Sequence, residues 1–309
     1  MEFFHKSHID FMARRKLAIV ASAVAILAGL VSLVLKGGPS YNIDFLGGTE
    51  VQIHFQHPKD TQAVRDVLAG INLAGAEIKQ FGSAQEFIIR LSGVSGDLQL
   101  TDHIMGGLKQ KFQDDVPELM SVNNVGPRIG KELRQSAIYA ILFSMGLLLA
   151  YISVRFDFIF GVGAVIALFH DVLITLGLFS ILNREVSLAV VASFLTLIGY
   201  SLNDTIVVFD RIRENLRSNR RGSEGIEEII NRSINDTLSR TIMTSGLTQI
   251  VVVVCLVFGG EILRDFFLVL FVGIIVGTYS SIFIAAPVVV EWYKGHQQAK
   301  IKHKPVAAR

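Results

Sequence analysis

Four ionisable side chains lie within, or at the edge of, otherwise apolar stretches of this sequence. His170 and Asp171 interrupt one stretch, Asp204 interrupts another beside Asn203, and Arg240 comes just before a third. A titratable group that is shielded from water is costly, and inside a membrane such groups are candidates for proton relay or ion transport. Proton uptake and release by a buried carboxylate is the chemistry that these residues suggest.

The spacing around Asp204 predicts a polar stripe on a helix. Four polar residues follow one another at i, i+4, i+7 and i+8, and these are Thr196, Tyr200, Asn203 and Asp204. That periodicity places them on one interior-facing side of an otherwise apolar helix. Burial disfavours an ionised carboxylate and a nearby cation favours it, so the distance from Arg240 would govern how readily Asp204 holds a proton.

Each of these groups also has a purely structural interpretation. Asp204 is followed closely by Asp210, so water at the membrane surface could reach it and leave it only a helix-end charge. Arg240 could extend to the interface, and His170 with Asp171 could form a self-satisfied pair that joins helices. Spacing alone leaves both interpretations open.

The segments that must position these residues are long and apolar. Hydrophobic residues make up 51% of the 309 residues and charged residues 18%, whereas soluble domains usually approach about a quarter charged. A helix that crosses a bilayer needs roughly 20 apolar residues. Six segments qualify: residues 17–35, 136–154, 158–182, 186–209, 242–258 and 266–290.

Basic residues predict the orientation of these spans. They cluster before residue 17, within 210–240 and in the tail, whereas the short loops 183–185 and 259–265 hold one arginine each. The positive-inside rule then places both termini and the basic loop in the cytoplasm. A cleaved signal peptide is the alternative for 17–35, but its long apolar run and the lack of a small-residue cleavage site favour a retained anchor.

The orientation places residues 36–135 on the far side as a periplasmic domain. Its apolar patterns predict, in order, a strand, a helix, two strands, a helix and a strand, at 49–56, 60–70, 76–81, 86–92, 97–114 and 118–125. The order β-α-β-β-α-β is that of a ferredoxin-like α+β fold. The domain has no cysteine pair, histidine cluster or glycine-rich phosphate loop, so we expect a binding domain without an active site.

The basic loop carries an amphipathic pattern. Its apolar positions are Ile226, Ile229, Ile230, Ile234 and Leu238. They predict a helix that lies on the membrane surface or packs under the bundle, and a solvated linker is the alternative. The predicted organisation is a cytoplasmic N-terminus (1–16), a first span (17–35), the periplasmic domain (36–135), a five-helix bundle (136–290) with the cytoplasmic loop 210–241, and a basic cytoplasmic tail (291–309).

Several function classes are excluded by the sequence. The formal net charge of +2 and the lack of basic runs with interleaved aromatics argue against nucleic acid. The single cysteine, Cys255, can form neither an intramolecular disulfide nor a metal site. No zinc-protease, serine-nucleophile or aspartyl-protease motif is present. We therefore predict a protein that is not an enzyme and has no cofactor and no metal.

Five segments, taken in order, resemble the SecF branch of the SecD/SecF family of export membrane proteins. The strongest is GYSLNDTIVVFDRIREN at 199–215. The others are NIDFLGGTEV (42–51), NVGPRIGKELRQSA (124–137), ALFHDVLITLGLFS (167–180) and SRTIMTSG (239–246). The family motif positions among them are Asp44, Phe45, Gly47, Gly48, Gly126 and Pro127.

The resemblance implies a partner and a mechanism. Such a subunit pairs with SecD in the bacterial inner membrane, associates with the SecYEG channel, and uses the proton-motive force to promote late stages of preprotein translocation. It also implies that Asp204 and Arg240 belong to the proton pathway, with which we group Asn203, Asp171 and His170. The alternative is half of a proton-coupled small-molecule exporter of the related resistance-nodulation-division superfamily.

Overall fold

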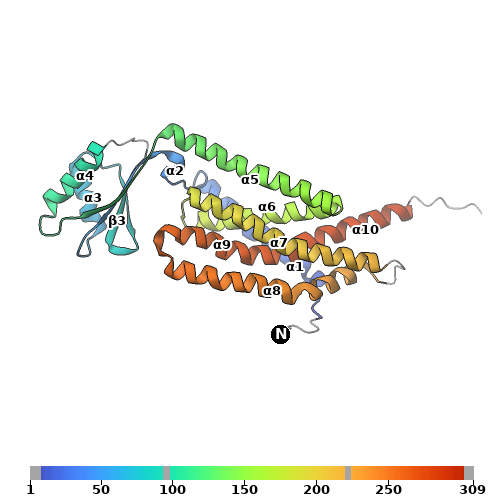
Figure 1. Ribbon diagram of the computed structural model, residues 1–309. Coiled ribbons are helices and arrows are strands. Elements are labelled where there is room, and N and C mark those ends of the chain that lie inside the picture. The colour runs from blue at the N-terminus through green and yellow to red at the C-terminus, as the bar shows by residue number, and fades with distance from the viewer. Residues whose placement is uncertain (1–7, 93–97, 220–223, 303–309) are drawn as a thin grey trace, which may run out of the picture.

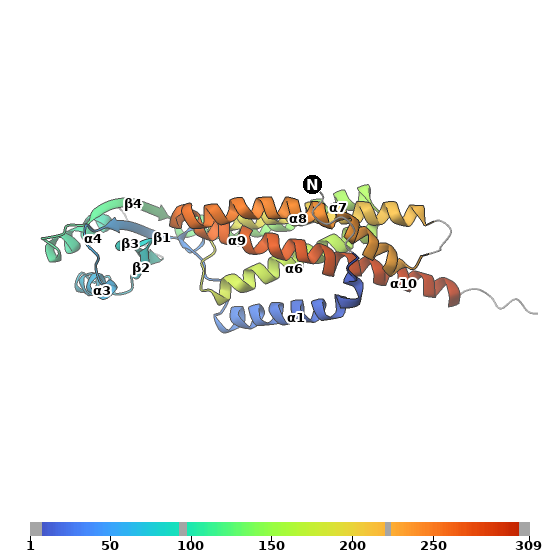
Figure 2. The same ribbon diagram turned by 90° about the horizontal axis from the view of Figure 1, so that it is seen from below.

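The computed structural model describes residues 8–92, 98–219 and 224–302 as an elongated molecule with two parts (Figures 1 and 2). One part is a bundle of long helices, and the other is a four-stranded sheet with two helices. The chain runs through α1 (Phe11–Leu35), then the α+β domain, and returns at α5 (Pro127–Arg155). The α+β domain is therefore an insertion at one end of the bundle.

The α+β domain has the predicted order of elements. These are β1 (Gly48–His54), α3 (Thr61–Gly70), β2 (Glu77–Phe81), β3 (Ser83–Ser92), α4 (Leu98–Lys111) and β4 (Glu118–Val125). The strands pair in the order β2-β3-β1-β4, and all neighbours are antiparallel. The order of elements and the pairing are those of a ferredoxin-like fold.

Alternation along the strands decides which face of the sheet the helices cover. Val51 and Ile53 of β1 are fully buried, whereas Gln52 between them points to the other face and is partly exposed. The buried set packs against Val64 and Leu68 of α3 in one hydrophobic core. Successive side chains of a strand alternate between faces, so Glu50, Gln52 and His54 of β1 lie on the opposite, mainly polar face.

The described residues include six helical segments long and apolar enough to cross a bilayer, as predicted. They are α1, α5, α6 (Phe158–Ile181), α7 (Leu188–Ser218), α8 (Ile226–Phe258) and the segment Leu263–Gly295. In the apolar stretches of α6 and α7, 56% of the residues are buried within the chain, against 11% in α1, α5 and α8. The helices α6 and α7 are therefore central, and the other three lie at the periphery.

Several helices are longer than their apolar segments indicated. The helix α5 begins at Pro127, α7 continues to Ser218, and α8 begins at Ile226. The predicted loop 210–241 is therefore largely helix, and its amphipathic half is the first part of α8. The buried Ile230 of that half packs into the bundle core. Hydropathy identifies only the part of a helix that lies in lipid, and the helix itself can continue into water beyond that part.

The last span contains a π-helical turn. The helix α9 (Gly260–Ser280) passes through η1 (Ser281–Ala285) into α10 (Ala286–Lys302). The N–H of Ala286 bonds to the carbonyl of Ser281, five residues earlier. Pro287 follows at once, and a proline ring inside an α-helix clashes with the carbonyl four residues before it. The wider π turn is the local change that lets the helix continue through this proline.

The α+β domain meets the bundle at the short helix α2 (Ile43–Leu46). Gly47 has φ +73°, and a Cβ there would lie 2.5 Å from the Cα of Pro127. An Asp44 carboxylate oxygen accepts a hydrogen bond from the backbone N–H of Leu188 at 2.9 Å. The predicted motif positions Asp44, Phe45, Gly47, Gly48, Gly126 and Pro127 thus lie at or beside this junction.

Candidate functional site

Asp171 is at the centre of the bundle, on α6, with 1% of its surface exposed. Its Oδ2 accepts hydrogen bonds from the hydroxyls of Ser201 on α7 (2.5 Å) and Ser280 on α9 (2.9 Å). Its Oδ1 lies 2.9 Å from Nδ1 of His170. This carboxylate therefore joins three helices through hydrogen bonds.

His170 continues the chain of contacts to α1. Its Nε2 lies 2.9 Å from the hydroxyl of Ser22, which lies 3.0 Å from the hydroxyl of Tyr279. The hydroxyl of Tyr279 bonds to the carbonyl of Ala18 at 2.6 Å. A carbonyl only accepts, so Tyr279 donates to Ala18, Ser22 donates to Tyr279, and His170 donates to Ser22 through Nε2.

The direction of these hydrogen bonds sets the number of protons that the His170–Asp171 pair holds. With Nε2 protonated, the contact between Nδ1 and the carboxylate requires one further proton, carried by either the ring or the carboxyl group. Both forms are electrically neutral as a pair. The two residues bond to each other and to hydroxyl groups of α1, α7 and α9.

Asp204 on α7 is the second buried carboxylate, with 6% of its surface exposed. Its Oδ2 accepts hydrogen bonds from Ser245 on α8 (2.7 Å) and Thr278 on α9 (3.1 Å). The hydroxyl oxygen of Thr278 also lies 2.9 Å from that of Ser245. Because each hydroxyl has one hydrogen, this contact and both bonds to an ionised carboxylate cannot all form at once. Within the described part of the chain no ion pair reaches Asp204, and its direct hydrogen-bond partners are neutral hydroxyls.

The predicted stripe around Asp204 faces inward at one position only. Asn203, Tyr200 and Thr196 are exposed on the outside of this chain, Tyr200 by 43%. Successive residues of an α-helix are about 100° apart, so Asn203 and Asp204 can lie on either side of the boundary between outer and inner faces. The expectation that all four line the interior is wrong for the chain taken alone.

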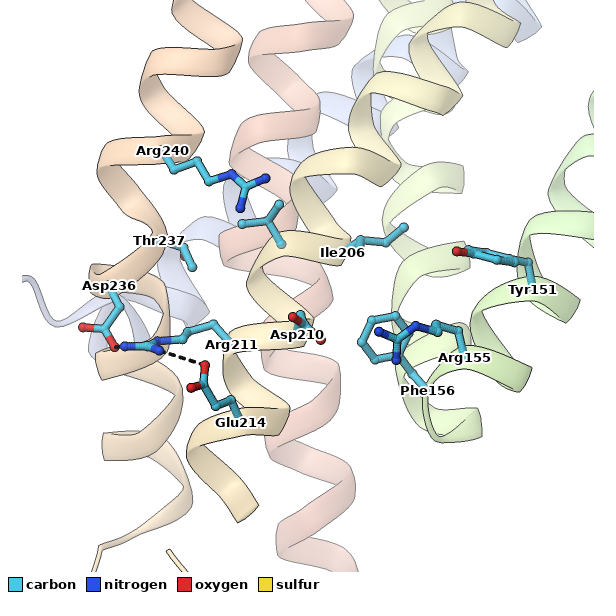
Figure 3. A pocket seen from close by; sticks show the side chains of 11 residues that line it. Tyr151, Arg155, Phe156, Ile206, Asp210, Arg211, Glu214, Asp236, Thr237 and Arg240 are labelled. Atoms are coloured by element: carbon cyan, nitrogen blue, oxygen red, sulfur yellow. Dashed lines mark hydrogen bonds and ion pairs between the residues drawn. The ribbon is translucent and has the colours of Figure 1, made fainter. Parts of the chain in front are cut away.

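Arg240 lies at an open cavity of about 640 Å³ at the end of the bundle away from the α+β domain (Figure 3). The lining residues are Tyr151, Arg155, Phe156, Ile206, Val207, Asp210, Arg211, Glu214, Asp236, Thr237 and Arg240. Arg211 pairs with Glu214 and Asp236, both at 2.8 Å. Arg240 makes no ion pair with a carboxylate of the described residues.

Sequence reasoning missed the hydroxyl partners of both carboxylates. Ser201, Ser280, Ser245 and Thr278 carry no signal of their own, because serine and threonine in helices commonly bond to a carbonyl of the preceding turn. Hydroxyl residues inside apolar segments, close to a carboxylate in a neighbouring span, were the available indication. Among the described residues no group of three or more acidic, histidine or cysteine side chains could hold a metal ion.

Six apolar spans, an inserted ferredoxin-like domain and two buried carboxylates define a multi-pass helical membrane protein of the transport type. Residues 107–295 match the family model described as protein export membrane protein SecD/SecF, C-terminal. The chain belongs to the SecD/SecF family.

Relatives of similar length carry the name protein translocase subunit SecF. One, from Rhodothermus marinus, is 46% identical over 94% of this chain and 95% of its own length. Another, from Desulfurispirillum indicum, is 45% identical over 96% of this chain and 97% of its own length.

Two solved structures of SecDF share the fold. A crystal structure from Thermus, described as a translocon-associated membrane protein, has a TM-score of 0.84 at 37% identity and covers 95% of this chain. A super-membrane-facing form has a TM-score of 0.70, also at 37% identity, and covers 97%. The chain spans only 40% and 41% of those two chains.

Proposed function

We propose that this chain is the SecF subunit of a Sec protein export machinery, acting with SecD to drive late steps of preprotein translocation through SecYEG with the proton-motive force. The observation that carries the proposal is a buried carboxylate, Asp204, bonded to two other spans in a chain whose full-length relatives are named SecF. The small-molecule exporter alternative is not favoured, because identity of 46% extends over 95% of such a relative.

The proposed orientation places the α+β domain in the periplasm. The start of α1, the last part of α7 and α10 lie at the opposite end of the bundle (Figure 1). These segments carry basic residues, among them Arg15, Arg211 and Lys294. The positive-inside rule assigns that end to the cytoplasm. The open cavity beside Arg240 would then connect the cytoplasm with the region below Asp204.

In the proposed mechanism Asp204 carries the proton that couples to export. The His170–Asp171 pair holds one proton between its partners and is neutral in either form. Asp204 has no such partner, so its protonation changes the net charge of the bundle. Arg240 favours the ionised form from the cavity side. When protonated, Asp204 must donate one hydrogen bond, so the hydroxyls of α8 and α9 would have to rearrange.

Partner recovery and complementation test the proposed subunit role. A tagged chain is expressed in cells depleted of SecF, solubilised in mild detergent and purified. We expect SecD to be recovered in stoichiometric amounts, SecYEG to be recovered more weakly, and export of a secreted reporter to be restored. Restored export by the chain in cells that lack SecD, or purification without SecD, would contradict the proposal.

A further inference from the structure

A second cavity lies between α1, α6 and the segment from η1 into α10. Its volume is about 590 Å³, within the range of small-molecule sites. Its walls are mainly apolar: Ile19, Ile159, Val162, Ile284, Pro287 and Val288. Ile284 belongs to the π-helical turn, and such turns are frequent at functional sites.

The rim of this cavity carries a cation and an anion side by side. Arg15 bonds to Glu291 at 3.2 Å and to Glu227 at 2.5 Å, and Lys294 also bonds to Glu227, at 2.6 Å. The side chain of Glu291 is 64% exposed, whereas that of Arg15 is 15% exposed. Glu227 therefore holds Arg15 in place, and the carboxylate of Glu291 is accessible to a ligand.

The cavity opens on a surface suited to lipid. Figure 2 shows α1 at one side of the bundle, with α6 and α9 between α1 and α8 along most of their length. Apolar side chains of α1 are exposed along this surface, including Leu17 (73%), Val24 (62%) and Leu27 (62%). Trp292 at the rim is the type of residue found at the level of lipid headgroups.

We propose that this cavity binds one phosphatidylethanolamine molecule. Its acyl chain would lie along the apolar walls, its phosphate against Arg15 and its ammonium against Glu291. A guanidinium suits phosphate oxygens, and a carboxylate accepts hydrogen bonds from the N–H groups of a primary ammonium. The quaternary ammonium of phosphatidylcholine has no N–H to donate, and an anionic headgroup would bring negative charge to Glu291.

Trp292 is the only tryptophan of the sequence, so its fluorescence reports on the cavity directly. The full chain is reconstituted in phosphatidylcholine bilayers that contain equal small fractions of brominated phosphatidylethanolamine or brominated phosphatidylcholine. We expect stronger quenching by the brominated phosphatidylethanolamine. Glu291→Gln should reduce that relative affinity by about tenfold, the size expected for a hydrogen bond to a charged group.

Two variants distinguish lipid binding in this cavity from general contact with bulk lipid. Val162→Phe fills the cavity and leaves both charges, so it should also abolish the preference. The double variant Trp292→Phe with Leu17→Trp moves the single tryptophan to the exposed face of α1. There both brominated lipids should quench its fluorescence equally. Equal quenching of Trp292 by both lipids, a preference that survives Glu291→Gln or Val162→Phe, or the same preference at position 17 would overturn the proposal.

Discussion

At the scale of the residue, the two buried carboxylates differ in how their charge is balanced. Asp171 shares a proton with His170, whose other nitrogen is committed to Ser22. Asp204 accepts only from Ser245 and Thr278, which are neutral. The interior of a membrane supplies little water to compensate a charge. In the proposed mechanism Asp204 is the carboxylate at which gain or loss of a proton changes the bonding between helices.

Asp115 in the α+β domain makes stability dependent on pH. The Lys59 ammonium at 2.8 Å, with the backbone N–H groups of Gln56 and His57, lowers the pKa of Asp115 from 3.8 to about 2. A lowered folded-state pKa contributes stability that is fully present above the unfolded value of 3.8 and is lost as pH falls toward about 2. We expect amide protection around residues 56 and 57, measured by hydrogen exchange and corrected for intrinsic rates, to fall between pH 5 and pH 3.

Asp115→Asn supplies the control for this prediction. The variant cannot ionise, so its amide protection should be lower at pH 5 and should change little on acidification. Equal amide protection in the parent and the variant at both pH values would show that Asp115 does not stabilise the segment around residues 56 and 57.

The residues that could be predicted from sequence are those whose type conflicts with their surroundings. A carboxylate in an apolar segment stands out, which is why Asp171 and Asp204 were identified. Ser201 and Ser245 are compatible with a helix anywhere, so only the packing of α7 and α8 against their neighbours reveals them as donors. For this chain taken alone, Asn203 does not face inward as predicted, because adjacent positions of one stripe can lie on opposite sides of a packing boundary.

At the scale of the element, α1 and α6 cross at two glycines. A Cβ on Gly177 would lie 2.7 Å from the Cα of Gly29, and the reverse distance is 2.6 Å. Gly177→Ala should force the helices apart at a cost of about 1–3 kcal/mol, as for overpacked cores. Thermal unfolding of the purified chain in detergent measures the effect. The matched control is Gly146→Ala in α5, where nothing lies within 4 Å of a new Cβ. This variant should be neutral or slightly stabilising. Equal losses of stability in both variants would contradict the close packing of α1 on α6.

The α+β domain is held to the bundle by Glu185, in the loop between α6 and α7. Its side chain pairs with Lys79 of β2 and Arg90 of β3, and Arg90 also pairs with Glu50 at 2.6 Å. Arg90 and Glu185 are only 11% and 15% exposed, so solvent screens their attraction weakly. We expect this network to fix the orientation of the domain.

Glu185→Gln should therefore let the domain move. Spin labels at residues 118 and 182, in a Cys255→Ser background, measure the distance between domain and bundle. We expect a broader distance distribution in Glu185→Gln. Glu77→Gln should leave it unchanged, because Glu77 pairs with Lys79 inside the domain. A narrow distribution in both variants would assign the orientation to α2 and the α5 start alone.

The existence of the helices was predictable and their ends were not. Hydropathy located all six spans, since apolar length is what a bilayer requires. The first turns of α5 and the first half of α8 carry charges, among them Lys131 and Arg232, that lie outside any apolar window. Packing of Ile230 and Ile234 into the bundle core, which sequence periodicity only suggested, makes α8 a single helix.

At the scale of the whole molecule, the bundle exposes polar groups of a central helix. Tyr200 and Asn203 of α7 are exposed, and the cavity at Arg240 is lined by residues of α5, α7 and α8. The related SecDF chains are more than twice as long as this one, which covers 40% of the first. In the proposed complex SecD covers this face. The polar stripe of α7, which the sequence predicts to face the interior, would then be buried between the two subunits.

Proton coupling should depend on Asp204 and Arg240 as one unit. Arg240→Ala removes the cation that favours ionised Asp204. We expect this variant to lose much of the gradient-dependent export, and the double variant Asp204→Asn with Arg240→Ala to lose little more than Asp204→Asn alone. Defects that add fully would show two independent roles.

The most direct test of the account is Asp204→Asn, measured as preprotein export into membrane vesicles with and without an imposed proton gradient. Asparagine preserves the shape of the side chain and can still accept from Ser245 and Thr278, but it cannot take up a proton. Asp157→Asn, at an exposed carboxylate just before α6, is the matched control. We expect the Asp204 variant to insert, to bind SecD and to lose the stimulation by the gradient, while the control keeps it. Full stimulation in Asp204→Asn would contradict the account and direct the search to Asp171.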